Sequence, residues 1–229
     1  MSYFCKNFLK VMAKKNKINE SFLIEKYMEY VLDNYKKPNS VFSFAKKFGF
    51  NESDFYSFYG SFESLESHIF VKFFENTIKT LENSKDYSNF DPMNKLLSFY
   101  FTFFGNLTAN RSYVKFCLSN ESSKINNLKS LKNLRKKFLN FIDALDLGTT
   151  EIKNKNLDDI KDRVINESYW IQMLVTLKFW LDDDSKDFDK TDLFIEKSIA
   201  ASFELTTTTP LKSVIDFGKF IFKEKIKMS

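Results

Sequence analysis

The sequence predicts an all-α protein of about nine helices, arranged in two domains. Its 229 residues include only 5 Gly and 3 Pro, so the tight turns that β-sandwiches and β-barrels need are scarce. Apolar residues make up 43% of the chain, which is enough for a substantial core, and they recur at helical spacing. We expect an N-terminal domain over 1–84, in which 1–18 form a basic arm, and a larger C-terminal domain over 85–229.

The N-terminal domain is predicted to hold two long helices with two short helices between them. An apolar stripe predicts the first long helix over 19–35, and the last covers 62–84. The boundaries of the short helices come from capping and helix-ending residues, which are, in chain order, Asn39 or Ser40, Gly49, Asn51, Gly60 and Ser61. Two short helices joined by a three-residue turn are typical of a helix-turn-helix motif.

The C-terminal domain is predicted to consist of helices over about 92–120, 125–145, 157–182, 190–208 and 210–227. The first and last of these begin where a capping residue precedes Pro, at Asp91-Pro92 and Thr209-Pro210. The segment DDDSKDFDK is predicted to be a polar linker. Its acidic run Asp182–Asp184 lacks the Gly and the ligand spacing of a calcium loop, so we expect a solvated helix end there.

Residues 40–66 read SVFSFAKKFGFNESDFYSFYGSFESLE and resemble the TetR family of one-component regulators. The residues that carry the resemblance are Ala45, Gly49, Phe55, Tyr56, Tyr59 and Leu65. The resemblance implies a TetR-repressor-like fold, in which the C-terminal domain encloses a ligand pocket and the last two helices form a dimer interface. The C-terminal stretch is also similar to a Bacteroidetes group classed among the TetR regulators.

Polar residues of the helix-turn-helix segment are candidate DNA contacts, namely Ser40, Ser43, Lys46, Lys47, Asn51, Ser53, Tyr56 and Ser57. Residues 1–47 hold ten Lys against four acids, which favours attraction to phosphates. Residues 48–71 hold four acids and neither Lys nor Arg. The helix dipole alone can explain Glu52 and Asp54 in the first turn of the recognition helix, but the same acids repel phosphate. Phe62 stands where the family usually has a phosphate-contacting Lys.

Aromatic and apolar side chains of the C-terminal domain are candidates for lining a pocket between helices. The set is Phe99, Phe103, Phe104, Tyr113, Phe116, Trp170, Met173, Phe179 and Trp180. Such a pocket suits a hydrophobic small molecule or lipid, for example an acyl chain or an isoprenoid. Simple packing in the core is the alternative explanation for each of these residues.

Apolar positions of the last two helices are candidates for a homodimer interface, as the resemblance implies. They are Ile195, Ile199, Phe203, Leu211, Val214, Ile215, Ile221 and Phe222. Several Lys surround the apolar face of the last helix. This helix is therefore either a dimer or core helix with a basic rim, or an interfacial helix that contacts the surface of an anionic membrane.

The sequence shows no pattern of a catalytic or metal-binding site. His68 is the only histidine, without a companion His or Cys, so we expect neither enzymatic activity nor a metal or other cofactor. The most apolar stretch, 96–105, is shorter than the roughly 18 residues of a membrane span. Because the first 15 residues also lack a long apolar run, we expect a soluble, cytoplasmic protein.

Two hypotheses about function remain. The first is a dimeric transcriptional regulator that binds double-stranded DNA through residues 39–59 and a hydrophobic effector in its C-terminal domain. The second is a TetR-fold protein that has lost specific DNA binding and acts as an accessory factor that binds lipid, isoprenoid or a partner protein. The mitochondrial lipid-binding accessory proteins of ubiquinone synthesis, whose fold is similar, are a precedent for the second. The acidic recognition segment favours the second hypothesis.

Overall fold

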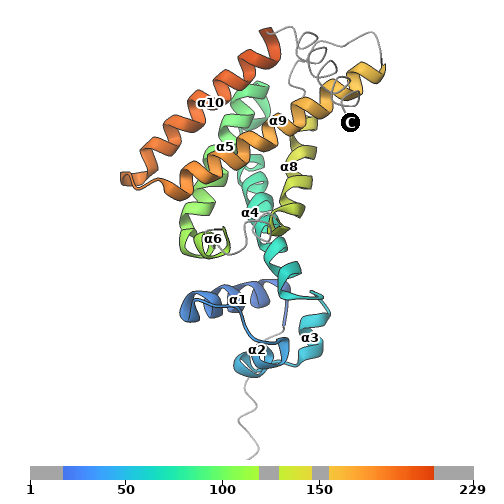
Figure 1. Ribbon diagram of the computed structural model, residues 1–229, viewed down its shortest axis with the longest axis vertical. Helices are drawn as coiled ribbons and strands as arrows, with labels where there is room; N and C mark the ends of the chain where they lie inside the picture. The colour runs from blue at the N-terminus through green and yellow to red at the C-terminus, as the bar shows by residue number, and fades with distance from the viewer. Residues whose placement is uncertain (1–17, 119–128, 146–154, 209–229) are drawn as a thin grey trace, which may run out of the picture. The chain divides into compact units, whose positions relative to one another are not determined.

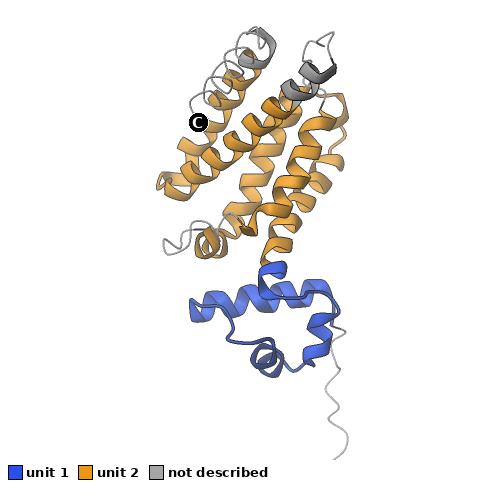
Figure 2. Ribbon diagram, turned by 45° about the vertical axis from the view of Figure 1, so that its right-hand side comes forward, with its two compact units in different colours: residues 1–65 blue, residues 66–229 orange. Residues whose placement is uncertain are grey.

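A computed structural model describes residues 18–118, 129–145 and 155–208, with the backbone alone for 155–162 and 205–208. Within these ranges it contains nine α-helices and two short 3-10 turns, and no strand. The predicted all-α fold is therefore confirmed. The chain divides into two compact units, 1–65 and 66–229, shown in different colours in Figure 2. This division lies inside a helix, whereas the boundary predicted from the sequence follows that helix.

Apart from the end of the second short helix, the helices of the first unit begin and end close to their predicted capping residues. They are α1 (Glu20–Asn34), α2 (Val41–Phe48), α3 (Glu52–Tyr56) and the first turn of α4 (Phe62–Glu82). The Asn19 side chain accepts a hydrogen bond from the backbone N–H of Phe22, and Ser40 caps α2. Gly49 ends α2 with a φ of 74°, which glycine adopts without strain. The α3 helix ends at Tyr56, before the predicted end near Tyr59.

The core of the first unit is a cluster of aromatic rings around Phe44, whose side chain has no exposed area. The rings within 6.4 Å of Phe44, centroid to centroid, are Tyr27, Tyr30, Phe48, Phe50, Phe55 and Phe62. Most of these pairs meet edge to face, which is a favoured aromatic geometry. One side chain on α2 therefore contacts α1, α3 and the start of α4, and it fixes the relative orientation of the helices of the motif.

The second unit is a bundle built on α5 (Pro92–Ala109), α8 (Lys132–Ala144), α9 (Lys155–Asp182) and α10 (Asp189–Thr208). In Figure 1, α10 lies beside α9 and α5, and α8 lies beside α9, as their contacts require. The later turns of α4 belong to this unit, where Phe74 meets Phe99 of α5. Shorter elements complete it: η1 (Tyr87–Asn89), α6 (Arg111–Leu118) and η3 (Lys186–Phe188).

The helix predicted to run from about 92 to 120 is broken at Asn110, so the single-helix prediction was wrong. Asn110 has φ −124°, and its side-chain amide donates to the carbonyl of Asn106 at 3.0 Å. Because Asn readily bonds to nearby backbone groups, it ends α5, and α6 starts at Arg111. The predicted arm over 1–18 lies almost wholly outside the described residues, as do the first four residues of the helix predicted over 125–145 and the last predicted helix, 210–227.

Asp183 corrects a second prediction, that the acidic run is a solvated helix end. Its side chain is only 6% exposed, and its carboxylate accepts four hydrogen bonds across the α9–α10 turn. The donors are the backbone and hydroxyl groups of Ser185, at 2.9 and 2.6 Å, and those of Thr191, at 2.9 and 2.6 Å. The segment between α9 and α10 is thus a tight turn around a buried carboxylate.

Arg111 also stabilises this turn. Its guanidinium donates to the carbonyls of Trp180, Leu181 and Asp183, at 2.8, 3.2 and 2.9 Å, which are carbonyls at the C-terminal end of α9. It also lies 4.5 Å from the ring centres of both Trp180 and Phe188. A cation at this end of a helix is favourable because it meets the unsatisfied carbonyls and the negative end of the dipole.

Candidate nucleic-acid interface and apolar sites

The segment α2–turn–α3 forms a helix-turn-helix with a buried and an exposed face. Its apolar residues Phe44, Ala45 and Phe55 point into the core of the first unit. All of the candidate DNA contacts lie on the exposed side: Ser40, Ser43, Lys46, Lys47, Asn51, Ser53, Tyr56 and Ser57. The structure therefore brings these eight residues to the surface of one motif, within 18 consecutive positions of the chain.

Several of the eight residues also hold the motif together. The Ser40 and Ser43 side chains each accept from the other's backbone N–H, at 3.1 and 3.3 Å. Asn51 donates to the Asp54 carboxylate from its backbone, at 2.9 Å, and from its side chain, at 3.2 Å. The Ser57 hydroxyl donates to the carbonyl of Ser53 at 3.0 Å. Ser40, Ser43 and Asn51 therefore have a structural role, because they cap α2 and α3.

The acids of α3 also engage local groups. Asp54 caps α3 and is partly buried. Glu52 accepts a hydrogen bond from the Tyr56 hydroxyl at 3.3 Å. Desolvation and the neighbouring Glu52 carboxylate raise the pKa of Tyr56. Tyr56 therefore stays a neutral donor at physiological pH.

The positive charge of the motif comes from two lysines at the end of α2. Lys47 lies 4.5 Å from the centre of the Tyr30 ring and 5.5 Å from that of Phe48. Lys46 is exposed and forms no ion pair with any other described residue. The next cation in the chain is Lys72, which belongs to the second unit. Within the motif itself, electrostatic attraction to a phosphate would thus come from the C-terminal turn of α2.

Phe42 is a candidate contact that the sequence analysis did not identify. It lies beside Ser43 on α2 and is 61% exposed. The apolar stripe of α2 passes through Val41, Phe44 and Ala45, and Phe42 falls outside it. A helical projection of residues 41–48 would therefore have marked this phenylalanine as an outward-facing side chain. Such a ring can make an apolar contact with a thymine methyl group.

The predicted pocket residues all belong to the second unit. Apart from Phe179, they lie in a packed, mainly aromatic cluster with few exposed atoms. Phe99 stacks on Phe103 at 5.5 Å and lies 4.6 Å from Phe141, which was not among the candidates. Trp180 meets Phe104, and its indole N–H donates to the Thr108 hydroxyl at 3.0 Å. The other candidates are buried, namely Tyr113, Trp170 and Met173, or partly buried, namely Phe116.

The Tyr100 hydroxyl lies inside this cluster and has no hydrogen-bond partner among the described residues. The side chain has no exposed area, and its ring meets Phe99, Phe104 and Phe138. Burial, together with nearby Tyr169, raises the pKa of Tyr100 well above its usual value, so the group is a neutral donor and acceptor. A buried hydroxyl in this position is suited to hydrogen-bond a polar atom of a molecule held between the aromatic rings.

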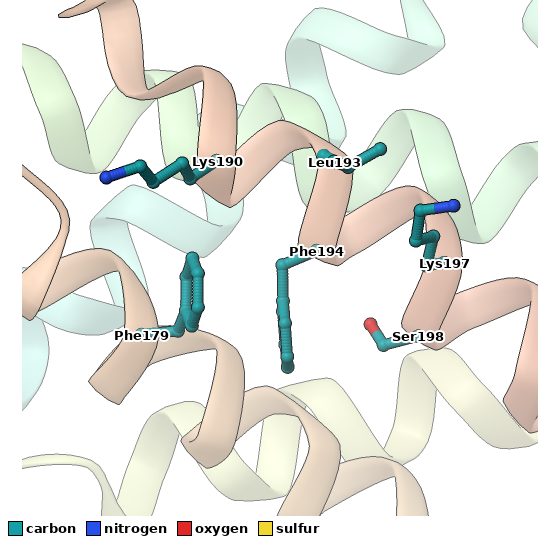
Figure 3. Close-up of a pocket in the computed structure, with 6 residues that line it drawn as sticks. All are labelled: Phe179, Lys190, Leu193, Phe194, Lys197 and Ser198. Atoms are coloured by element: carbon teal, nitrogen blue, oxygen red, sulfur yellow. The ribbon is translucent and has the colours of Figure 1, made fainter. Parts of the chain in front are cut away.

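Phe179 lies apart from the cluster, on the outer side of α9. Its ring stacks on Phe194 of α10 at 4.7 Å, and it borders a hollow of about 470 Å³ (Figure 3). The other residues that line the hollow are Lys190, Leu193, Lys197 and Ser198, all on α10. The hollow is therefore an apolar surface with two lysines at its edges.

The candidate dimer residues on α10 lie mostly in the core of their own chain. Ile195 and Ile199 have no exposed area, and α10 packs against both α5 and α9. A side chain without exposed area cannot touch a second copy, so these two residues support the bundle. Phe203 is partly exposed. The other candidates, Leu211, Val214, Ile215, Ile221 and Phe222, lie outside the described residues.

The described residues carry neither a metal-ligand cluster nor a membrane-spanning helix. No group of three or more His, Cys, Asp or Glu side chains there is arranged to hold a metal ion. His68, on α4, is partly buried and borders a separate hollow with Glu75 and Lys137. No described helix combines the length and the apolar character that crossing a membrane requires.

Comparison with known proteins gives a match to a protein family. The family model described as "tetracyclin repressor-like, C-terminal domain" matches residues 95–221, which is more than half of the chain. The matched range begins in α5, so the helix-turn-helix lies outside it. No curated protein and no solved structure matches the chain.

Proposed function

Because the chain belongs to the family of tetracyclin repressor-like C-terminal domains, we propose that it is a TetR-like transcriptional regulator that acts in the cytoplasm. It binds double-stranded DNA through the helix-turn-helix of residues 39–59. The observation that supports this function is the exposed polar face of α2 and α3, on which all eight candidate contacts lie. The acids of α3 are compatible with it, because Asp54 is used in capping and Glu52 accepts from Tyr56.

The regulator is proposed to be a homodimer, as members of this family typically are. A dimer presents two helix-turn-helix motifs to two half-sites, whose centres lie about one helical turn, roughly 34 Å, or a multiple of it apart. The operator should accordingly have two-fold symmetry.

The test of DNA binding compares the protein's own upstream region with random DNA of equal length. We expect the upstream region to bind at least about tenfold more tightly, with an affinity that falls steeply as salt rises. Fluorescence anisotropy at several salt concentrations measures both quantities. Equal affinities for the two DNAs would overturn the proposal.

Substitution of both Lys46 and Lys47 by Ala should weaken binding to upstream and random DNA by the same factor. Each phosphate contact contributes about 0.9 to the slope of log K against log salt, so the slope should fall by up to about 2. The matched control replaces Lys79 and Lys115, which are exposed on α4 and α6, and has the same change in net charge. If the control lowers the slope as much, the attraction is a property of net charge and not of α2.

The proposed effector is a hydrophobic small molecule with one polar group, held by the aromatic cluster of α5, α8 and α9. The Tyr100 hydroxyl supports this proposal because it is buried without a partner among the described residues. Binding regulates DNA affinity only if the effector favours one arrangement of the dimer over the other. Extraction of the purified protein into organic solvent, followed by mass spectrometry, identifies a retained effector.

Tyr100→Phe should raise the free energy of unfolding of the ligand-free protein by up to about 1 kcal/mol, because it removes an unsatisfied hydroxyl and keeps the ring. The same variant should retain less effector after purification. Urea unfolding and the extraction assay measure the two effects. Tyr87→Phe, at a partly exposed position, is the control, and its free energy of unfolding should stay within about 0.5 kcal/mol of the parent value. A loss of stability in Tyr100→Phe would show that the hydroxyl has a partner in the ligand-free protein.

A second function is favoured by the charge of residues 48–71, which contain four acids and neither Lys nor Arg. In this case the protein is an accessory factor that binds lipid, isoprenoid or a partner protein, and it has lost specific DNA binding. Equal affinity for upstream and random DNA, together with an extracted lipid or binding to anionic liposomes, would support it.

A further inference from the structure

The outer face of α9 carries a stripe of exposed apolar side chains. Val164, Ile171, Val175 and Phe179 are 43%, 58%, 49% and 36% exposed. Their spacings of seven, four and four residues place them along one side of the helix. The opposite side of α9 is buried in the bundle through Tyr169, Trp170, Met173 and Trp180, among others. Helix α9 is therefore apolar on two faces, of which only one is covered by the described residues.

The stripe continues onto α10 at the end nearest the α9–α10 turn. Phe194 stacks on Phe179, and Leu193 beside it is 51% exposed. Figure 3 shows both phenylalanines and Leu193 at the hollow between the two helices. Exposed apolar side chains gathered on one side of a helix often mark a contact with another segment or molecule.

Helices α9 and α10 are antiparallel, which places the end of α10 beside the start of the stripe. Thr191 donates a hydrogen bond to Asp183, and Phe179 stacks on Phe194. Gln172 hydrogen-bonds with both Ser198 and Ser202. The contacting residue numbers therefore decrease along α9 as they increase along α10. Continued to the last residue of α10, Thr208, this relation reaches the region of Val164. The chain beyond Thr208 thus starts at the level of the first residue of the stripe.

Residues 210–227 have an apolar pattern that matches the stripe. Leu211, Gly218, Phe222 and Ile226 are separated by seven, four and four residues, the same spacings as in Val164, Ile171, Val175 and Phe179. A helix over 210–227 would be about 27 Å long, and the stripe spans about 22 Å at 1.5 Å per residue. The segment can therefore cover the whole stripe if it runs parallel to α9.

Both surfaces carry charged side chains at the end near the α9–α10 turn. The end of the segment carries Lys223, Lys225 and Lys227. The α9–α10 turn, which this end would reach, carries exposed carboxylates at Asp182, Asp184, Asp187 and Asp189. Asp182, Asp184 and Asp187 are already paired with Lys178, Lys190 and Lys186, so these charges do not set the direction of the segment. The parallel direction instead follows from the end of α10, which leaves the chain at the start of the stripe.

We propose that residues 210–227 dock as an amphipathic helix on the α9 stripe of their own chain, with Leu211, Gly218, Phe222 and Ile226 opposite Val164, Ile171, Val175 and Phe179. Val214 and Ile221 lie at one edge of the same apolar face and stay available for a second copy. This arrangement assigns the exposed face of α9 a partner within the chain. It is independent of DNA binding.

A disulfide pair in the full chain tests the register and distinguishes the occupants of the stripe. In a variant with Cys5 and Cys117 replaced by Ser, Val175→Cys is combined with Phe222→Cys. Mild oxidation should form an intramolecular disulfide. The two thiols should then no longer react with an alkylating reagent, and the product should run as a monomer in a non-reducing denaturing gel. The control combines Val175→Cys with Phe220→Cys, which lies on the opposite side of the segment. Its disulfide should form at least about tenfold more slowly, because cysteines whose Cβ atoms point apart cannot be bridged.

Two results would overturn the proposal. A disulfide-linked dimer would show that the segment of a second copy covers the stripe. Equal rates for the two cysteine pairs would show that the segment does not dock in this register, as when a small molecule fills the hollow. Neither result depends on DNA binding, so failure of the docking proposal would leave the proposed regulator function untouched.

Hydrogen exchange measures docking without cysteines. Ile171→Asp places a charge in the middle of the stripe and should increase the exchange of amides in 210–227. Ser112→Asp, at an exposed position of α6, adds the same charge and should leave this exchange unchanged. Unchanged protection in Ile171→Asp would contradict docking on α9.

Discussion

Phe44→Ala is expected to destabilise the helix-turn-helix unit by about 3–5 kcal/mol. The ring has no exposed area and meets six other aromatic rings from α1, α2, the turn, α3 and α4. Its removal leaves a cavity that small surrounding helices cannot close without losing their mutual orientation. Since a domain of this size has a small core, a loss of this magnitude approaches its whole stability.

If the protein binds DNA as proposed, this variant should lose DNA binding while the second unit stays folded. Urea unfolding followed by far-UV circular dichroism should show an early transition that is absent in the parent protein. Phe42→Ala is the matched control, because it removes the same ring from the same helix at a position that is 61% exposed. It should change the free energy of unfolding by no more than about 0.5 kcal/mol. Similar losses in the free energy of unfolding of the two variants would contradict the role assigned to Phe44.

Local signals in the sequence predicted α1 and α2 almost to the residue and the start of α3, but not its end. Ser40 and Gly49 act on the backbone within four residues of themselves, so their effects can be read without tertiary structure. The break at Asn110 was missed because the apolar pattern continues through it into α6. Apolar periodicity reports which face of a segment is buried, and it does not report a change in direction.

The missed role of Asp183 has a different cause. Its partners are Ser185 and Thr191, and they meet the carboxylate only because the chain reverses between α9 and α10. In the sequence, the same residue is one of three consecutive acids, two of which are indeed exposed. Burial of one member of a charged run depends on the tertiary turn, and composition therefore could not reveal it.

The candidate apolar sites show the same limit of periodicity. Ile195 and Ile199 follow the spacing of an interface helix, yet they pack in the core, because an apolar stripe looks the same whether its partner is in the chain or outside it. Phe179 was grouped with the pocket residues, and it lies on the outer face of α9. Both faces of α9 are apolar, so the sequence could not tell which one meets the bundle.

Asp183→Ala should have a second large effect, a loss of about 3 kcal/mol in the free energy of unfolding of the second unit. The substitution leaves the backbone N–H and hydroxyl of Thr191 without their acceptor, and Thr191 is only 1% exposed. Arg111 in addition loses a nearby opposite charge, although its bonds to the helix carbonyls remain. Asp184→Ala, at the exposed neighbouring position, is the control and should change stability by less than about 0.5 kcal/mol.

The stabilisation by Asp183 should also depend on pH, with a sign fixed by its hydrogen bonds. Burial by itself raises the pKa of Asp183, but the four hydrogen bonds from Ser185 and Thr191 outweigh it and hold the pKa well below the usual range. A carboxyl group whose pKa is lower in the folded than in the unfolded state stabilises the fold fully above its unfolded pKa of about 3.9. This contribution is lost as pH falls through that value towards the folded pKa.

Thermal unfolding of the parent protein and of Asp183→Asn between about pH 3 and 7 measures this dependence. The difference in free energy of unfolding should be constant above about pH 5 and should narrow as the solution is acidified below about pH 4. Asp184→Asn should give a difference that stays near zero across the same range, because its carboxylate is exposed. A difference between the parent and Asp183→Asn that did not change with pH would mean that the carboxylate keeps the same pKa in the folded and unfolded chains. The turn between α9 and α10 would then be held by the neutral hydrogen bonds and by Arg111 alone.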